Sequence, residues 1–184
     1  MKKLKIVLLM LIFLVGCTNK TEKTDLLMKK YEAAYSDLVS NDKFASSSSF
    51  YDIETVVNSY ENDKFRIDTI IDNPKVAMYN VIVIAEINSI GVKQYEEVLP
   101  SLGIVDQSIY NLIPFQVNQD EGFYAGLVVS GISERAKGEV IVEIAWTNYA
   151  ETKSYQEFLK LPYGEQIEEE TEDLPEAESE SDGE

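Results

Sequence analysis

The spacing of apolar residues changes its period once along the chain, close to residue 45. Before that point, between Asp25 and Val39, apolar positions recur with the period of one face of a helix. These positions are Leu27, Tyr31, Ala34, Tyr35 and Leu38. Asp25 favours a helix start through its negative charge, and residues 41–43 provide the stop. The pattern predicts an amphipathic helix over residues 25–42, whose apolar stripe packs on the rest of the chain or docks a partner.

Beyond residue 50 the pattern is that of short strands separated by turn residues. The predicted strands cover residues 51–60, 64–72, 79–87, 94–99, 109–117, 122–132, 138–147 and 153–161. Residues 61–64 are typical of a turn, so the first two strands form a hairpin, although residues 51–60 also fit a short helix. The strands at 94–99 and 109–117 are the weakest, because Pro100 ends one and Pro114 interrupts the other.

The alternation within the strands predicts how the sheets are covered. Residues 79–87 are apolar on both faces, which predicts a central strand covered from both sides. Residues 138–147 alternate cleanly, which is typical of antiparallel sheets with one solvated face. In that strand Val140, Val142, Ile144 and Trp146 face one way, and Glu139, Glu143 and Thr147 face the other.

Short strands at near-regular spacing predict a mainly β fold over residues 50–163. We expect an antiparallel β-sandwich that is immunoglobulin-like in general character, preceded by the one helix. The paired cysteines of antibody domains are missing, and Trp146 falls in the penultimate strand. The likeness therefore concerns the architecture and not that superfamily.

The first seventeen residues have the layout of a secretory signal. Lys2, Lys3 and Lys5 precede an apolar run of ten residues that ends at Val15. Ten helical residues reach about 15 Å, whereas the hydrocarbon core of a bilayer is about 30 Å thick. The run is therefore predicted to be a signal-peptide core rather than a permanent membrane span.

Gly16 and Cys17 directly follow the apolar run, and the tetrapeptide Leu14-Val15-Gly16-Cys17 resembles the lipobox of bacterial lipoproteins. The resemblance covers only these first seventeen residues. It implies that the Cys17 sulfur receives a diacylglyceryl group, and that signal peptidase II removes residues 1–16. The lipid would hold the protein on the extracytoplasmic face of the cell membrane, with residues 17–24 as a polar, lipidated tether. Thr18 follows Cys17, and the Lys-, Ile- and Asn-rich composition is typical of a Gram-positive organism.

The net charge of −17 is unevenly distributed over the 184 residues. Residues 165–184 carry eleven acidic and no basic side chains, and the lysines before Cys17 contribute +3, which leaves −9 for the rest. Like charges with few apolar residues predict a disordered acidic tail over residues 164–184. An acidic body and tail disfavour binding to nucleic acid, which depends on neutralising phosphates.

The residue inventory excludes several kinds of catalytic site. The chain has no histidine, and its one cysteine, Cys17, is assigned to lipid. Serine or cysteine nucleophiles paired with histidine, and zinc sites of histidine and cysteine, therefore cannot form. Residues 118–122 offer oxygen ligands, but Phe123 and Val129 stand where an EF-hand needs glycine and glutamate. No cofactor or metal is expected.

Two functions stay in view at the level of sequence. The first is a non-enzymatic module that binds or assembles with an unknown envelope protein or ligand, for which the tyrosine-rich end at Tyr149, Tyr155 and Tyr163 offers a contact patch. The alternative is a cell-envelope hydrolase that uses paired carboxylates. Its candidates are Asp68, Glu86, Glu143 and Glu157, which the alternation places on solvent-facing sides of strands.

Overall fold

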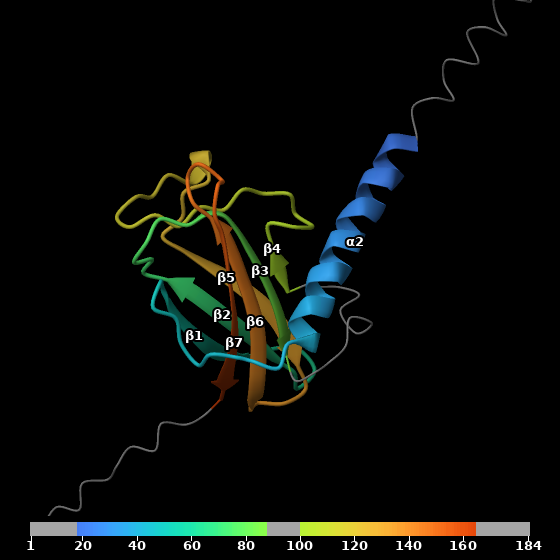
Figure 1. The fold of residues 1–184 in the computed structure, drawn as a ribbon. Coiled ribbons are helices and arrows are strands. Elements are labelled where there is room, and N and C mark those ends of the chain that lie inside the picture. Colours follow the sequence, from blue (N-terminus) through green and yellow to red (C-terminus); the bar gives the residue numbers. More distant parts are fainter. Residues whose placement is uncertain (1–17, 88–99, 165–184) are drawn as a thin grey trace, which may run out of the picture.

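The computed structural model describes residues 18–87 and 100–164 of the chain (Figure 1). Within these described residues, one long helix is followed by seven strands and a short 3₁₀ helix. In chain order the elements are α2 (Thr18–Ser40), β1 (Asp52–Ser59), β2 (Phe65–Asp72), β3 (Tyr79–Ile87), β4 (Ser101–Leu102), η2 (Gln119–Glu121), β5 (Gly126–Ser133), β6 (Gly138–Thr147) and β7 (Ser154–Tyr163).

The strands form two antiparallel sheets that pack face to face. One sheet has the order β1-β2-β5 and the other has the order β4-β3-β6-β7. If the strands are lettered A, B, C, C′, E, F and G along the chain, the sheets are A-B-E and C′-C-F-G. This is the arrangement of immunoglobulin-like sandwiches, without a D strand among the described residues. The predicted antiparallel β-sandwich is therefore confirmed.

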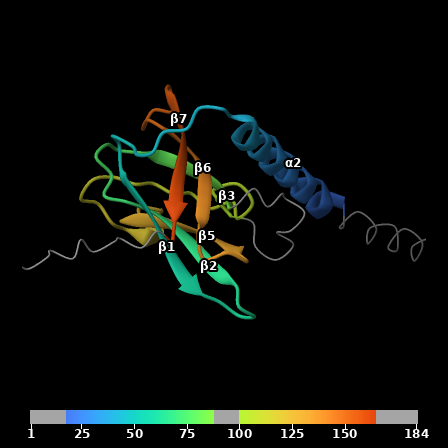
Figure 2. The same cartoon turned by 90° about the horizontal axis from the view of Figure 1, so that it is seen from below.

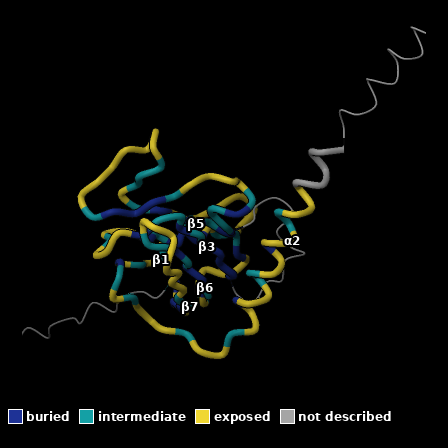
Figure 3. The backbone as a smooth tube through the Cα atoms, turned by 45° about the horizontal axis from the view of Figure 1, so that its top comes forward, coloured by how far each residue is buried: buried dark blue, intermediate teal, exposed yellow. Residues whose placement is uncertain are grey.

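The core lies between the two sheets and is built from alternate residues of each strand. Ile67 and Ile71 of β2 face Val83 of β3 and Val142 of β6 across it, and all four are fully buried. Figure 3 shows buried residues gathered at the centre of the sandwich, in strands such as β3 and β6, and exposed residues along the loops. Burial of these aliphatic side chains is the main favourable term in the folding of such a sandwich.

Trp146 is the centre of an aromatic cluster at one end of this core. The ring of Tyr155 stacks on it at 5.4 Å between centroids, with an interplanar angle of 12°. Phe50 and Tyr51 meet the indole edge-on at 5.5 and 6.0 Å. Such stacked and edge-on pairs add to the stabilisation that comes from area burial alone, and here they join β6, β7 and the segment that leads into β1.

Most of the predicted strands are confirmed. The hairpin of β1 and β2 pairs Asp52 with Asp72 and Ser59 with Phe65, so the helical alternative for residues 51–60 is wrong. The bounds of β3 and β6 match the predicted 79–87 and 138–147. The predicted strand at 122–132 begins later, at Gly126, because η2 and its flanking bridges occupy the preceding residues. The prediction for 94–99 lies outside the described residues.

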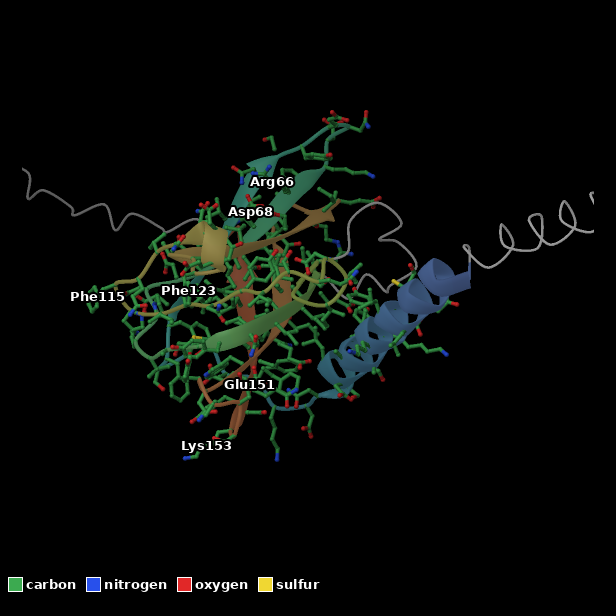
Figure 4. The ribbon with its side chains drawn as sticks, turned by 90° about the horizontal axis from the view of Figure 1, so that it is seen from above. Arg66, Asp68, Phe115, Phe123, Glu151 and Lys153 are labelled. Atoms are coloured by element: carbon green, nitrogen blue, oxygen red, sulfur yellow. The ribbon has the colours of Figure 1, made fainter. Side chains whose placement is uncertain are left out.

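The predicted strand at 109–117 is wrong, since this segment forms a loop with isolated bridges only. Leu112 bridges to Met78 and Asn111 to Phe123, and Phe115 takes a left-handed backbone conformation with φ 62°. The apolar residues that suggested a strand divide between two roles: Leu112 is buried against the sandwich, whereas Phe115 is fully exposed. Figure 4 shows Phe115 on the side of the molecule away from α2.

The helix is longer at its start than the sequence pattern predicts. It begins at Thr18 rather than Asp25, so residues 18–24, which were expected to form a polar tether ahead of the helix, belong to it. Residues 18–24 contain no glycine or proline that would stop a helix from extending. Its C-terminal end lies against the outer face of the four-stranded sheet, and its N-terminal end lies away from the sandwich (Figures 1 and 2).

The apolar stripe of α2 packs on the domain, as one of the two sequence interpretations expects. Tyr31 and Leu38 are fully buried in a second hydrophobic cluster with Ile84 of β3 and Ile104. The helix thus covers a sheet face that the alternation of β6 predicts to be solvated. This covering changes the environment of every polar side chain on that face.

Candidate functional site

Three of the four candidate carboxylates are buried, which corrects the prediction that they are solvated. Asp68, Glu86 and Glu143 are 7, 4 and 6% exposed. Glu86 and Glu143 are buried because α2 lies over the outer face of β3 and β6. Asp68 is buried by the polar side chains around it on the outer face of the other sheet.

Asp68 has hydrogen-bond donors on both carboxylate oxygens. Ser130 Oγ donates to its Oδ1 at 2.7 Å. Asn58 Nδ2 and Arg66 Nη2 each donate to its Oδ2 at 2.9 Å. Figure 4 shows Arg66 beside Asp68 on the same strand. With both oxygens occupied, Asp68 serves to join β1, β2 and β5 and has little capacity left for a substrate.

Glu86 and Glu143 are neighbours on adjacent strands beneath α2. Ile84 pairs with Glu143 and Glu86 pairs with Ile141, so the two glutamates are diagonal partners on one face. Burial raises the pKa of both carboxyl groups above the ordinary value of 4.5. Each keeps one buried oxygen, Oε2, without a hydrogen-bond partner.

The other interactions of the two carboxyl groups differ. The Tyr35 side chain of α2 hydrogen-bonds to Glu86, which partly offsets the rise of its pKa. Gln156 Nε2 of β7 donates to Glu143 Oε1 at 2.7 Å, again opposing the rise, while the negative charge of Asp37 adds to it. Helix and sheet therefore both contact this pair of acids.

A groove of about 450 Å³ opens between α2, the start of β3, the end of β6 and residues 103–109. Glu143 lines it, together with apolar side chains from each of these elements. They are Leu27, Ala34, Ile82, Ile104, Ile109 and Ala145. Lys30, Asn80, Gln107 and Ser108 supply further polar groups. A concave, mostly apolar site of this volume with a few polar groups is the usual form of a small-ligand pocket.

A β-bulge shapes one end of the groove. Tyr79 pairs with Thr147 and Ile82 with Ala145, so β3 has one more residue than β6 between these two pairs. Asn80 lies in the bulge with φ 51°, and its side-chain amide donates to Thr147 Oγ1 and Glu151 Oε1 at 3.3 and 3.1 Å. The bulge bends β3 at the place where it enters the groove.

Asp106 holds the loop that forms the opposite wall. Its Oδ1 accepts from the backbone N–H of Gly103 at 2.9 Å and from that of Ser108 at 3.4 Å. Its Oδ2 accepts from the Tyr110 hydroxyl at 2.6 Å. A side chain that ties three points of one loop together fixes that loop before any ligand arrives. The wall that residues 103–109 form is therefore held in place by hydrogen bonds within its own loop.

The remaining candidates do not form the patch that the sequence suggests. Glu157 is half-buried and accepts a hydrogen bond from Ser48 Oγ at 2.7 Å. Tyr149 is 82% exposed at the tip of the β6–β7 hairpin, Tyr155 stacks on Trp146, and Tyr163 is buried at the other end of β7, with its hydroxyl 2.9 Å from Ser133 Oγ. The proposed contact patch of these three tyrosines is therefore wrong, because they lie at different places and depths.

The lipobox residues Leu14, Val15, Gly16 and Cys17 lie outside the described residues, so lipidation stays a prediction. Within residues 18–87 and 100–164, no helix is long and apolar enough to cross a membrane. In the same part of the chain, no three acidic, histidine or cysteine side chains are grouped so that they could hold a metal ion.

The groove is the feature that sequence reasoning missed, although one signal for it was present. The prediction that β3 is covered on both faces already implies that Glu86 is covered. Combined with pairing to β6, it would also have placed Glu143 under the same cover. The strand order was needed to join the two observations.

Fold and site together define an immunoglobulin-like β-sandwich with a helix laid over one sheet and a carboxyl-bearing groove beneath that helix. Comparisons with models of protein families, with curated proteins and with solved structures find no match to this chain.

Proposed function

We propose that this protein is a lipid-anchored binding module on the extracytoplasmic face of a Gram-positive cell membrane, and that it is not an enzyme. The observation that carries the binding role is the groove, whose mostly apolar lining includes Glu143, a buried carboxyl group with one unpartnered oxygen. A buried acceptor without a donor is costly, and a ligand that supplies the donor removes this cost. The chain has no histidine and no cysteine besides Cys17, which supports a role without nucleophilic catalysis.

The anchoring part of the proposal rests on the lipobox resemblance at Cys17. Attachment of diacylglyceryl and acyl chains to one cysteine gives a stable anchor, because a single chain alone binds reversibly. Expression in a Gram-positive host with labelled palmitate should label the wild-type chain and not the Cys17→Ala variant. Label on the Cys17→Ala variant would show that the lipid is attached elsewhere.

The binding part is tested by photo-crosslinking in cells. A photoreactive amino acid at Gln107, on the groove, should give a discrete adduct that mass spectrometry can identify. The matched control carries the same group at Glu54, which is exposed on the other sheet. An adduct that forms equally at both positions, or at neither, would contradict a binding role for the groove.

The envelope hydrolase is the second candidate, because Glu86 and Glu143 are two buried carboxyl groups that lie diagonally on one sheet face. Glycoside hydrolysis needs one protonated and one ionised carboxyl group on either side of the same bond. Here burial raises the pKa of both groups, so their environments do not set one apart as the ionised partner. Glu143 lines the groove, whereas Glu86 lies further along β3, where it hydrogen-bonds to Tyr35 and is not among the lining residues. We therefore expect no new reducing ends when purified cell-wall glycan is incubated with the protein. Release that is lost in Glu143→Gln would favour the hydrolase instead.

A further inference from the structure

We propose that the groove under α2 binds a small organic ammonium ion, with an apolar body between the walls and its N–H groups directed at Glu143. The inference deepens the proposed binding function and rests on it. It names the chemistry of the ligand from the groups that the groove presents.

The Glu143 side chain is buried and only partly hydrogen-bonded. It is 6% exposed, its Oε1 accepts one hydrogen bond from Gln156, and its Oε2 has no partner. A buried carboxylate is stabilised when a cation or a strong donor occupies its free oxygen. Glu143 lines the groove, so a ligand seated there lies beside this side chain.

A second negative charge lies near this carboxyl group. Asp37 on α2 adds negative potential at Glu143, and the chain without its N-terminal lysines and acidic tail still has a net charge of −9. Lys30 also lines the groove, but it is exposed and forms no ion pair with Glu143, both residues being described. The negative potential disfavours carboxylate and phosphate ligands and favours a cation.

The walls of the groove beside Glu143 are largely apolar. Ile82 and Ala145 provide apolar surface from the strands beside Glu143, and Leu27 and Ala34 provide it from the helix above. An inorganic cation would find a single carboxyl group here, because no three acidic, histidine or cysteine side chains of the described residues are grouped so that they could hold a metal ion. An ammonium group on an alkyl or aryl body matches both the single carboxyl group and the apolar walls.

The test is equilibrium dialysis of the full chain in nanodiscs against radiolabelled phenethylammonium, with empty nanodiscs as the blank. 2-Phenylethanol serves as the probe of similar shape without charge, and phenylacetate as the anionic probe. We expect saturable binding of the ammonium, at least tenfold tighter than binding of the alcohol, and no saturable binding of phenylacetate. Equal affinity for ammonium and alcohol would overturn the proposal, because the groove would then be merely apolar.

Glu143→Gln is the decisive variant, since it keeps the shape and the bond from Gln156 while it removes the charge. It should weaken phenethylammonium binding at least tenfold. Glu139→Gln is the matched control, an exposed glutamate four residues away on the same strand, and should leave the affinity within twofold. Unchanged binding in Glu143→Gln would overturn the assignment of the carboxyl group.

A second variant tests the groove without touching its charge. Ala34→Leu places a larger side chain on the helix wall and should reduce binding by at least fivefold, with the circular dichroism spectrum preserved. If Ala34→Leu and Glu143→Gln both bind as the wild type does, the amine binds elsewhere and the inference fails. The crosslink at Gln107 reports the proposed function separately: a groove-specific adduct without ammonium binding would overturn only the ligand class.

Discussion

Glu86 and Glu143 lie diagonally across the β3–β6 ladder, on one face of the sheet and under one helix. Because each is buried with a free oxygen, each favours its neutral form more strongly in the folded protein than in the unfolded chain. The docked helix and the two acids are thus energetically linked. Several properties of the protein follow from that link.

Stability should fall as the pH rises above the ordinary glutamate pKa of 4.5. Above that value the unfolded chain releases these protons first, because the pKa of each group is raised in the folded state. The folded state then holds more protons than the unfolded one, and the free energy of unfolding decreases until the pH passes the folded pKa values. Urea unfolding from pH 4.5 to 8, followed through the fluorescence of Trp146, the one tryptophan, measures this slope.

Glutamine variants of Glu86 and Glu143, compared with the wild type, show how much each carboxyl group contributes to this pH dependence. Glu86→Gln and Glu143→Gln should each flatten the decline, and the double variant should flatten it most. Glu139→Gln is exposed and should keep the wild-type slope. A decline of equal steepness in the double variant would assign the pH dependence to other groups.

Docking of α2 depends on Leu38, which is fully buried between the helix and the sheet. Leu38→Ala should lower the free energy of unfolding by about 2–4 kcal/mol, through lost burial and the cavity that remains. Leu26→Ala, at a 56% exposed position of the same helix, should change it by less than about 0.5 kcal/mol. Urea unfolding followed by circular dichroism compares the two, and equal effects would mean that the helix is not docked in solution.

The sequence predicts a large part of this architecture because, within one strand or helix, the spacing of apolar residues indicates which side chains face the core. Trp146 and the aliphatic residues of β6 face the core as their alternation indicates. Alternation shows which residues share a face, but it does not show whether another element covers that face. The burial of Glu143 therefore could not be inferred from its own strand. The strand predicted for residues 109–117 is wrong for a related reason. Leu112 is apolar because it is buried where a loop packs on the sandwich, and not because it belongs to a strand.

Asp68 should matter for stability and not for binding. Asp68→Ala leaves the donors of Asn58, Arg66 and Ser130 without their acceptor, at a cost of about 1–3 kcal/mol in the free energy of unfolding. Asp72→Ala, an exposed position at the end of the same strand, should cost less than about 0.5 kcal/mol. Both variants should bind phenethylammonium as the wild type does, and loss of binding in Asp68→Ala alone would place a site on the other sheet.

Gly103 connects the groove wall to the sheet. It has φ 81°, and a Cβ atom there would lie 2.7 Å from the carbonyl oxygen of Val81. Gly103→Ala should therefore displace the loop that Asp106 holds, at a cost of about 1–3 kcal/mol, and weaken phenethylammonium binding several-fold. Gly164→Ala is the matched control, because this glycine is also left-handed (φ 69°) but follows β7 outside the groove lining; it should lower the free energy of unfolding and leave the affinity unchanged. Wild-type affinity in Gly103→Ala would show that this wall is not used.

The early start of α2 has a mechanical consequence. A helix of 23 residues is about 34 Å long, and its far end is fixed on the sandwich by Tyr31 and Leu38. Thr18 directly follows Cys17, so a lipid on that sulfur would be joined to the sandwich by a continuous helix instead of a flexible linker. With such an anchor, the helix would restrict the tilt of the sandwich above the bilayer, and with it the direction from which a molecule can approach the groove.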